Sequence, residues 1–185
     1  MSYHCNMARL TKEKWLAEGE KILSEFAQDK LRILYLCDRL GVTRGSFYHH
    51  FQSIEDYVRE LMKQWSRENT AAFIQAANQG GSPREQMEIL NAHVMEADQS
   101  VEAAIRSWSY YHPIVKEYLA IVDQRRIDYL EQIFVHFEAD ATRARIMAEL
   151  EYAMLVGIQQ LFPKASKEDL LKRYEVYGQL HWSNR

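Results

Sequence analysis

The chain has 185 residues, 47% of them apolar and 26% charged, a composition typical of a globular protein large enough to bury a core. No apolar run approaches the ~20 residues needed to cross a bilayer, which argues against a membrane-spanning protein. The net charge of −3 is unevenly distributed. Residues 1–69 carry 11 Lys and Arg against 10 Asp and Glu, whereas the remaining residues carry 12 against 16. A nucleic-acid partner would therefore meet the amino-terminal part, through a few well-placed contacts that salt weakens quickly.

The two cysteines, Cys5 and Cys37, are too few for a disulfide framework. We expect Cys37 to be a reduced thiol that packs in the core of a helical segment. The first six residues lack the apolar region of a secretory signal, and we expect a cytoplasmic protein.

Helical periodicity runs through the whole chain, and strand-like alternation is absent over any useful length. The sequence predicts an all-α protein of about nine helices. The expected ranges are 11–28, 33–40, 44–50 and 53–77, followed by helices that begin at about 82, 100, 113, 140 and 166. The helix from 113 is expected to reach residue 138, with a possible break near Asp123, and Phe26 of the first helix is expected to face inward.

Capping side chains mark four of the predicted helix starts: Ser53, Ser82, Asp140 and Ser166. Pro83 and Glu85 complete a capping box after Ser82. The two glycines before that box are the clearest break in the chain. We predict a three-helix amino-terminal domain over residues 1–52 and a helical domain over residues 53–185, with the helix from about 53 linking the two.

The stretch from 36 to 51 predicts two short helices joined by a tight turn. Gly41 suits the position after a helix end, where a positive φ is common. Thr43 suits the N-cap of the next helix, its hydroxyl accepting from the first free amides. In that helix Phe47, His50 and Phe51 share one face, so we expect His50 to be partly buried. This arrangement is a helix-turn-helix whose second helix presents its other face to DNA.

The residues from Leu40 to Phe51, followed by Ser53 and an acidic helix start, closely resemble the DNA-binding domain of TetR-type transcriptional regulators. The match covers about residues 10 to 60. A second, weaker pattern is similar to the ligand-binding half of one TetR subgroup, and it consists of Arg106-x-Trp108, Pro113-x-Val115 and Asp123-x-x-Arg126-x-x-Tyr129-Leu130. Together the two patterns span most of the chain.

The predicted DNA contacts are Arg32, Thr43, Arg44, Gly45, Ser46, Tyr48 and His49. Arg44 starts the second helix, where arginine can pair bidentately with guanine; the alternative is a solvated surface arginine. Tyr48 suits a phosphate contact, and Thr43 combines its cap with a phosphate contact. The chain departs from the family pattern at Ile54, where a lysine is usual, and at Arg32, which replaces the usual threonine cap.

The carboxyl-terminal half is rich in aromatic residues and methionine, a pattern that fits either a helical core or an apolar pocket with a few polar groups. The resemblance implies a ligand cavity beneath the helix from 53 to 77. The candidate ligand-binding residues are Met95, Arg106, Trp108, Tyr111, His112, Tyr129 and Tyr152. Arg106 and Asp123 could equally form a structural ion pair.

The run from 152 to 158 is apolar almost all round, so a helix there must be covered on both sides. One cover is its own bundle and the other a second copy of the chain, with Gly157 allowing close approach. The alternative is a central core helix. The candidate dimer residues are Leu150, Met154, Gly157, Ile158, Leu171, Tyr174 and Gly178.

We therefore expect a ligand-responsive transcriptional regulator, a repressor that binds a near-palindromic DNA operator as a homodimer and responds to an unidentified small-molecule effector. The alternative is a protein-interaction module whose helix-turn-helix no longer binds DNA. We expect no enzyme, metal site or cofactor, because Glu-x-x-His pairs, His-Glu-x-x-His and phosphate-binding glycine loops are all missing.

Overall fold

The computed structural model describes residues 10–138, 140–163 and 165–182, and for residues 178 and 180–182 the backbone alone. Across these residues the chain forms ten α-helical segments and no strand. Segment α4 (Ile54–Ser66) continues through a π-helical turn (Arg67–Ala71) into α5 (Ala72–Ala77), so the ten segments make nine helices. The predicted all-α class is confirmed.

The other elements are α1 (Lys12–Phe26), a 3-10 turn (Ala27–Lys30), α2 (Ile33–Leu40), α3 (Arg44–His50), α6 (Pro83–Glu96), α7 (Gln99–Ser109), α8 (Pro113–Phe134), α9 (Ala141–Leu161) and α10 (Lys167–Trp182). Two predicted helices end early. α1 stops because Ala27 takes a positive φ of 51°, and Phe26 is 40% exposed, contrary to the inward position predicted for it. α8 continues through Asp123 without a break and ends at Phe134. There the backbone hydrogen bonds span three residues instead of four, as from the His136 N–H to the Ile133 carbonyl, and these bonds tighten the last turn.

The four predicted caps are confirmed by hydrogen bonds to the free amides of each first turn. The cap oxygens of Ser53, Ser82, Asp140 and Ser166 accept from the amides of Asp56, Glu85, Thr142 and Asp169 at 3.1, 3.3, 3.1 and 3.1 Å. Glu85 also accepts from the amide of Gly81 at 2.7 Å, which completes a reciprocal cap at the start of α6.

The chain divides into two compact units. The first contains the described residues up to Trp65 together with Ser100–Leu119, and the second contains Ser66–Gln99 and the described residues from Ala120 onward. The boundaries of these units differ from the functional division at residue 53, which stays a prediction.

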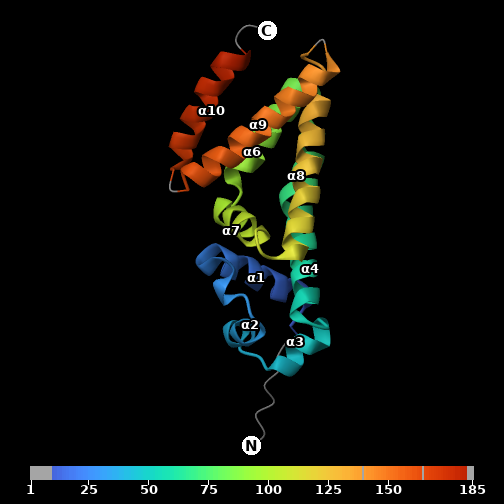
Figure 1. Ribbon diagram of the computed structural model, residues 1–185, viewed down its shortest axis with the longest axis vertical. Helices are drawn as coiled ribbons and strands as arrows, with labels where there is room; N and C mark the ends of the chain where they lie inside the picture. Colours follow the sequence, from blue (N-terminus) through green and yellow to red (C-terminus); the bar gives the residue numbers. More distant parts are fainter. Residues whose placement is uncertain (1–9, 139, 164, 183–185) are drawn as a thin grey trace, which may run out of the picture. The chain divides into compact units, whose positions relative to one another are not determined.

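An aromatic core fixes the helices of the first unit. Trp15 of α1, Phe47 of α3 and Tyr57 of α4 are each 0% exposed. The Phe47 ring lies 5.5 Å from the Trp15 ring and 5.8 Å from the Tyr57 ring, measured between centroids. The Tyr57 hydroxyl donates to the Trp15 carbonyl at 2.8 Å. These contacts hold α1, α3 and α4 together and orient α3 (Figure 1).

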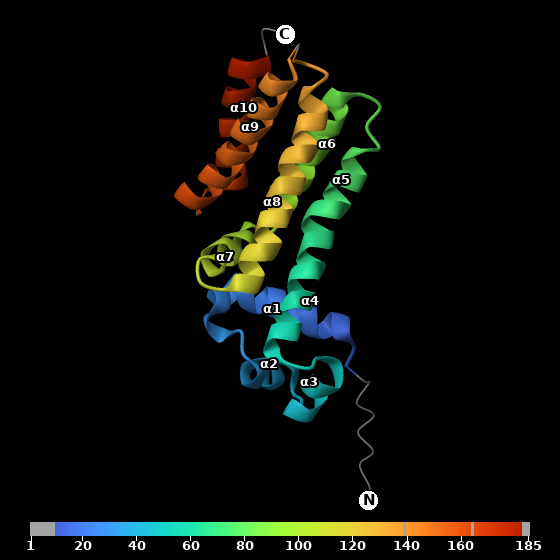
Figure 2. The same ribbon diagram turned by 45° about the vertical axis from the view of Figure 1, so that its right-hand side comes forward.

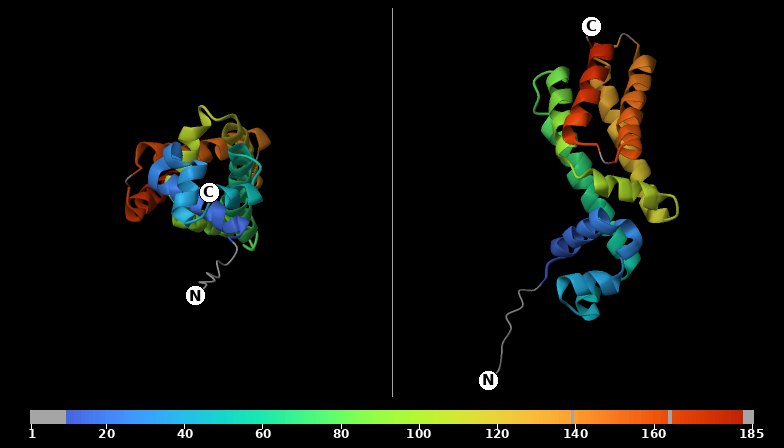
Figure 3. Two further views of the ribbon diagram at one scale, coloured as in Figure 1. Left: turned by 90° about the horizontal axis from the view of Figure 1, so that it is seen from below. Right: turned by 90° about the vertical axis from the view of Figure 1, so that its left-hand side faces the viewer.

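The second unit has a separate apolar core made by α5, α6, α8 and α9. Its buried members are Ala77, Met87, Tyr129, Leu130, Ile133, Phe134, Ala144, Met147, Ala148 and Tyr152. Within this unit α5 and α6 run antiparallel, as do α8 and α9 (Figure 2). α10 folds back along α9 as the last helix of the chain (Figure 3). Of the helices described, none has the length and hydropathy that a membrane span requires.

Candidate nucleic-acid interface

The turn between α2 and α3 has the geometry of a glycine-closed helix end. Gly41 lies in the left-handed region with φ 66° and ψ 34°. Its N–H donates to the Asp38 carbonyl at 3.1 Å, and the Val42 N–H donates to the Cys37 carbonyl at 2.9 Å. This pair of bonds is a Schellman motif, which satisfies the last carbonyls of α2 and turns the chain toward α3. Cys37 is a buried free thiol, as predicted.

The inner face of α3 is anchored by one fully buried ring. Phe47 packs between Trp15 and Tyr57 and lies 5.2 Å from the Phe51 ring. His50 is half-buried, with its ring 6.4 Å from that of Trp15, which confirms its predicted packing role. Since buried aromatic contacts fix this side of α3, its opposite side is the one presented to solvent.

The residues predicted to contact DNA lie on that outer side and beside it. Arg44, Gly45, Tyr48 and His49 are exposed, with Tyr48 at 56%, and Ser46 is half-buried. Thr43 and Arg32, at the N-cap positions of α3 and α2, are exposed as well. The first compact unit therefore exposes Arg32 at the start of α2 and, on α3 and its N-cap, an arginine, two hydroxyl groups and an imidazole; we call the seven predicted residues together the α3 surface.

Thr43 differs from its prediction in one respect. Its backbone has the extended conformation of an N-cap, with φ −85° and ψ 161°, but its hydroxyl makes no capping hydrogen bond to the described residues. The backbone closes the turn without it, since the Thr43 carbonyl accepts from the Ser46 amide at 3.0 Å. The prediction that the Thr43 hydroxyl caps α3 is therefore wrong, whereas its predicted phosphate contact stays a prediction.

An ion-pair network between α1 and α2 engages one arginine of the first unit. Arg39 Nε donates to Glu18 at 2.7 Å, and its two terminal nitrogens donate to Glu25 at 2.6 and 3.0 Å. The hydrogen bonds from Arg39 lower the pKa of Glu25, and those carboxylates raise the pKa of Arg39. This network could not be predicted from the sequence, because no local pattern joins residues 18, 25 and 39.

At the start of α4 the carboxylate of Asp56 provides a negative charge beside the free backbone amides. The Asp56 carboxylate accepts from the Gln52 amide at 2.9 Å while the Ser53 hydroxyl accepts from the Asp56 amide. Ile54, where the family pattern has lysine, is half-buried. This helix end therefore attracts a phosphate less than an uncapped end with a lysine would.

The residues predicted to bind a ligand are divided between the two units. In the first unit Arg106 pairs with Glu102 at 2.7 Å, and the rings of Trp108 and His112 lie 4.8 Å apart. Tyr111 is 62% exposed, and its hydroxyl accepts from Gln28.

In the second unit the buried Tyr129 donates to Asn78 at 2.9 Å, and the buried Tyr152 donates to Asp123 at 2.6 Å. Met95 is half-buried. Arg106 thus forms an ion pair with Glu102, and its pairing with Asp123 stays a prediction.

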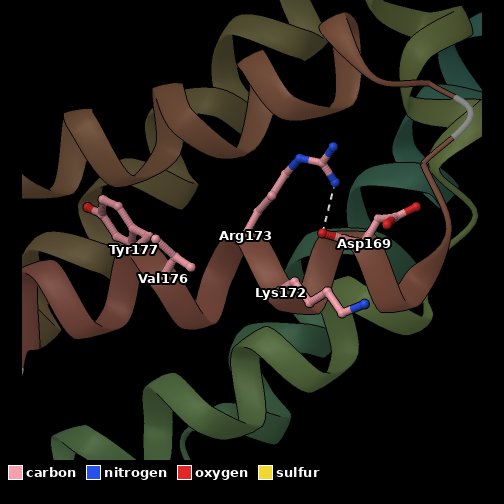
Figure 4. Close-up of a pocket in the computed structure, with 5 residues that line it drawn as sticks. All are labelled: Asp169, Lys172, Arg173, Val176 and Tyr177. Atoms are coloured by element: carbon pink, nitrogen blue, oxygen red, sulfur yellow. Dashed lines mark hydrogen bonds between the residues drawn. The ribbon is translucent and has the colours of Figure 1, made fainter.

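A shallow surface groove of about 510 Å³ lies along α10 and is lined by Asp169, Lys172, Arg173, Val176 and Tyr177 (Figure 4). Arg173 donates to the Asp169 carbonyl one turn earlier at 2.8 Å. The groove is widely open and all its lining residues belong to one helix. It includes none of the residues predicted to bind a ligand.

An apolar face of α9 is exposed. Ile146 is 49% exposed, Leu150 56% and Leu161 74%, and these residues recur on one side of the helix together with Gly157. Among the described residues outside its own stretch of α9, no atom lies within 4 Å of a Cβ built at Gly157. On α10, Leu171 is 49% exposed and Tyr174 is half-buried.

Three further residues complete the predicted dimer set. Met154 and Ile158 are half-buried, and Gly178 lies on α10 among the residues described by backbone alone.

Comparisons with solved structures give the same fold repeatedly. A candidate transcriptional regulator from Saccharomonospora viridis in complex with choline superposes with a TM-score of 0.76 at 16% identity, over 92% of this chain and 96% of that one. A TetR transcriptional regulator from Legionella pneumophila gives 0.72 at 13% identity, over 89% and 95%. A regulator of the TetR/AcrR family from Aquifex aeolicus gives 0.66 at 17% identity, over 90% and 98%. No family model and no curated protein matches the sequence.

The architecture is therefore that of the TetR-type transcriptional regulators. The fold implied by the sequence resemblance is confirmed over nearly the whole chain.

Proposed function

We propose that this protein is a DNA-binding transcriptional regulator, a repressor that acts as a homodimer and is released by a small-molecule effector. The observation that carries the proposal is the exposure of Arg44, Tyr48 and His49 on a helix whose other side is fixed by the buried Phe47. Arginine reads guanine in the major groove, and phenols position a protein on phosphates. The fold shared with known regulators supports the same function.

Homodimerisation rests on the exposed apolar face of α9. Leucines that are more than half exposed on one side of a helix are costly in water, and a second copy of the chain would cover them. Two copies would carry two α3 helices into successive major grooves about 34 Å apart on a near-palindromic operator. An effector would release DNA by preferring the arrangement that does not fit this spacing.

Two observations favour the rival, a protein-interaction module that has lost DNA binding. Arg39 is occupied by Glu18 and Glu25, and the start of α4 is capped by Asp56 with Ile54 beside it. Both reduce the attraction of the first unit for phosphates. The proposal therefore requires that the α3 surface alone supplies affinity and sequence selectivity.

The test is selection of bound duplexes from a random pool with the full chain, followed by fluorescence anisotropy titration of the selected duplex and a scrambled one. We expect the selected duplex to bind at least tens of times more tightly, with affinity falling steeply between 50 and 200 mM salt, on the order of the dependence of other phosphate-contacting proteins. Binding that ignores sequence, or no binding at low salt, would support the interaction module instead.

A further inference from the structure

The helix made by α4 and α5 contains one widened turn. Over Arg67–Ala71 the chain is π-helical, and the Ala72 N–H donates to the carbonyl of Arg67, five residues earlier. In an α-helix the same amide would bond to Glu68, so the turn holds one residue more than an α-helical turn does. Its sequence contains neither Gly nor Pro, the residues that most often distort a helix, so a side chain that enters the backbone ladder is the next cause to consider.

Arg126 of α8 donates to this π turn at two atoms. Its Nη2 lies 3.2 Å from the Asn69 carbonyl oxygen, and its Nε lies 3.0 Å from the Thr70 hydroxyl. Thr70 is only 2% exposed, so these bonds form away from bulk water. Hydrogen bonds from a charged donor are roughly twice as strong as neutral ones, and one that reaches a helix carbonyl competes with the regular backbone ladder.

The rest of the guanidinium is held by α9. Arg126 Nη1 donates to the Tyr152 hydroxyl at 3.1 Å, and that hydroxyl donates in turn to Asp123 at 2.6 Å. Tyr152 is 5% exposed, and the Arg126 guanidinium lies 6.0 Å from the centre of its ring. The guanidinium is therefore fixed in position by groups of α8 and α9, all within the second compact unit.

We propose that Arg126 is a latch that sets the register of the α4–α5 helix. With the guanidinium in place, its donors stabilise the wide turn. With the guanidinium withdrawn, the turn returns to the α-helical register, and the residues on its two sides shift by about 1.5 Å and about 100° around the helix axis. The chain passes from the first compact unit to the second between Trp65 and Ser66, just before this turn, so the latch sets the register between α4 and α5.

The consequence for DNA binding rests on the proposed function, because α4 follows directly after the helix-turn-helix. A shift of the Tyr152 side chain on α9 would move the hydroxyl that holds Arg126. The latch thus provides a path by which a change in the helical bundle alters the helix that leads to α3. The latch itself is a property of the second unit and is measurable without DNA.

The test combines the substitution Arg126→Met with a deletion of Glu68. The deletion removes the extra residue of the turn and so converts the π turn into an α-helical turn. Arg126→Met keeps an apolar stem and removes the donors; Arg125→Met, at an exposed position next to it, is the matched control. We expect Arg126→Met to lower the Tm of the full chain by about 4–8 °C and to speed deuterium exchange of the amides around residues 69–74. Arg125→Met should change neither.

In the chain that lacks Glu68, Arg126→Met should lower the Tm by less than half of its effect in the natural chain, since no wide turn remains to be held. An equal loss in both backgrounds would overturn the latch. Should the shortened chain fail to fold, the crystal structure of Arg126→Met decides: an Ala72 amide bonded to Glu68 supports the proposal, and one still bonded to Arg67 refutes it. Neither readout depends on DNA, so the latch and the proposed function fail separately.

Discussion

The Tyr57 hydroxyl occupies the space that a side chain at Gly19 would need. A Cβ built at Gly19 would overlap the phenol oxygen, with the ring carbon that carries this oxygen at 3.1 Å and a Leu61 methyl at 3.3 Å. The same phenol donates to the Trp15 carbonyl one turn earlier on α1. Close approach of α1 and α4 at Gly19 thus allows Tyr57 to reach its acceptor, and Tyr57 in turn packs against Phe47 of α3.

This relationship predicts a double-mutant result. Gly19→Ala should destabilise the protein by about 1–3 kcal/mol, because the added methyl displaces the buried phenol. In a Tyr57→Phe background the phenol oxygen is gone, so Gly19→Ala should destabilise the protein clearly less. The double mutant should therefore lose less stability than the two single mutants together. Urea unfolding of the four proteins measures the cycle; strict additivity would mean that the two residues do not compete for space.

The helix-turn-helix could be predicted from the sequence because its signals are local. The positive φ of Gly41, the capping by Ser53 and the shared face of Phe47 and His50 each depend on residues within one or two turns. The bounds of α2 and α3 follow from those signals. Thr43 is the exception, because its backbone took the predicted cap conformation without the side-chain bond.

Features that join distant parts of the chain could not be predicted in this way. Arg39 meets Glu18 across 21 residues, and Arg126 meets Thr70 across 56. The π turn has no sequence signal of its own, since its donors come from another helix. The division of the predicted ligand residues between two compact units likewise follows from packing between helices far apart in the chain.

Arg44 is the residue whose removal should affect sequence reading most. Arg44→Ala should weaken binding to the selected duplex by roughly 1–3 kcal/mol and relax the preference at one base pair. Arg84→Ala is the control, because Arg84 is a well-exposed arginine of α6 that pairs with Glu88 at the surface. Anisotropy titrations on the selected and scrambled duplexes decide: an equal loss on both would reduce Arg44 to a phosphate contact.

A substitution at Gly45 should have opposite effects on the stability of the protein and on its affinity for DNA. It is an exposed glycine inside α3, and the nearest described atom beyond the helix backbone to a Cβ built there is the Thr43 hydroxyl oxygen, at an ordinary 3.6 Å. Gly45→Ala should therefore stabilise the protein by about 0.5–1 kcal/mol, since alanine favours the helix. The same methyl should weaken DNA binding because it stands where the helix approaches the groove. Urea unfolding should thus show a higher free energy of unfolding, and anisotropy titration should show a lower affinity for the selected duplex. An unchanged affinity would mean that Gly45 does not lie at the contact with DNA.

Gly157 tests the proposed dimer without disturbing the single chain. The space beyond it is open, so Gly157→Leu should leave the helical content unchanged. Across a close interface the added side chain would overpack, and sedimentation should show a monomer where the natural chain is a dimer. Gln132→Leu adds the same kind of apolar surface at an exposed position of α8 and serves as the control. A Gly157→Leu protein that stays dimeric would locate the interface elsewhere.

His112 should make the free energy of unfolding depend on pH in a range that can be measured separately from the carboxylates. Its Nδ1 is buried with no hydrogen-bond partner among the described residues, and its ring lies against Trp108. Burial lowers the pKa of His112 below its ordinary 6.5, although the nearby Glu55 acts in the opposite direction. The unfolded chain therefore binds a proton that the folded chain does not, and stability should decline as the pH falls below about 6.5 toward the folded pKa.

Carboxylates whose pKa values are lowered by ion pairs, such as Glu60 beside Lys12 and Lys63, destabilise the fold only below their ordinary 4.5. Urea unfolding between pH 5.0 and 7.5 consequently leaves these carboxylates charged and covers the range in which histidines titrate. We expect the free energy of unfolding of His112→Gln to depend less steeply on pH in this range than that of the natural chain, whatever its absolute value. His136→Gln, at an exposed position after α8, is the matched control variant. Identical slopes for His112→Gln and the natural chain would show that the ring at 112 takes up its proton equally well in both states.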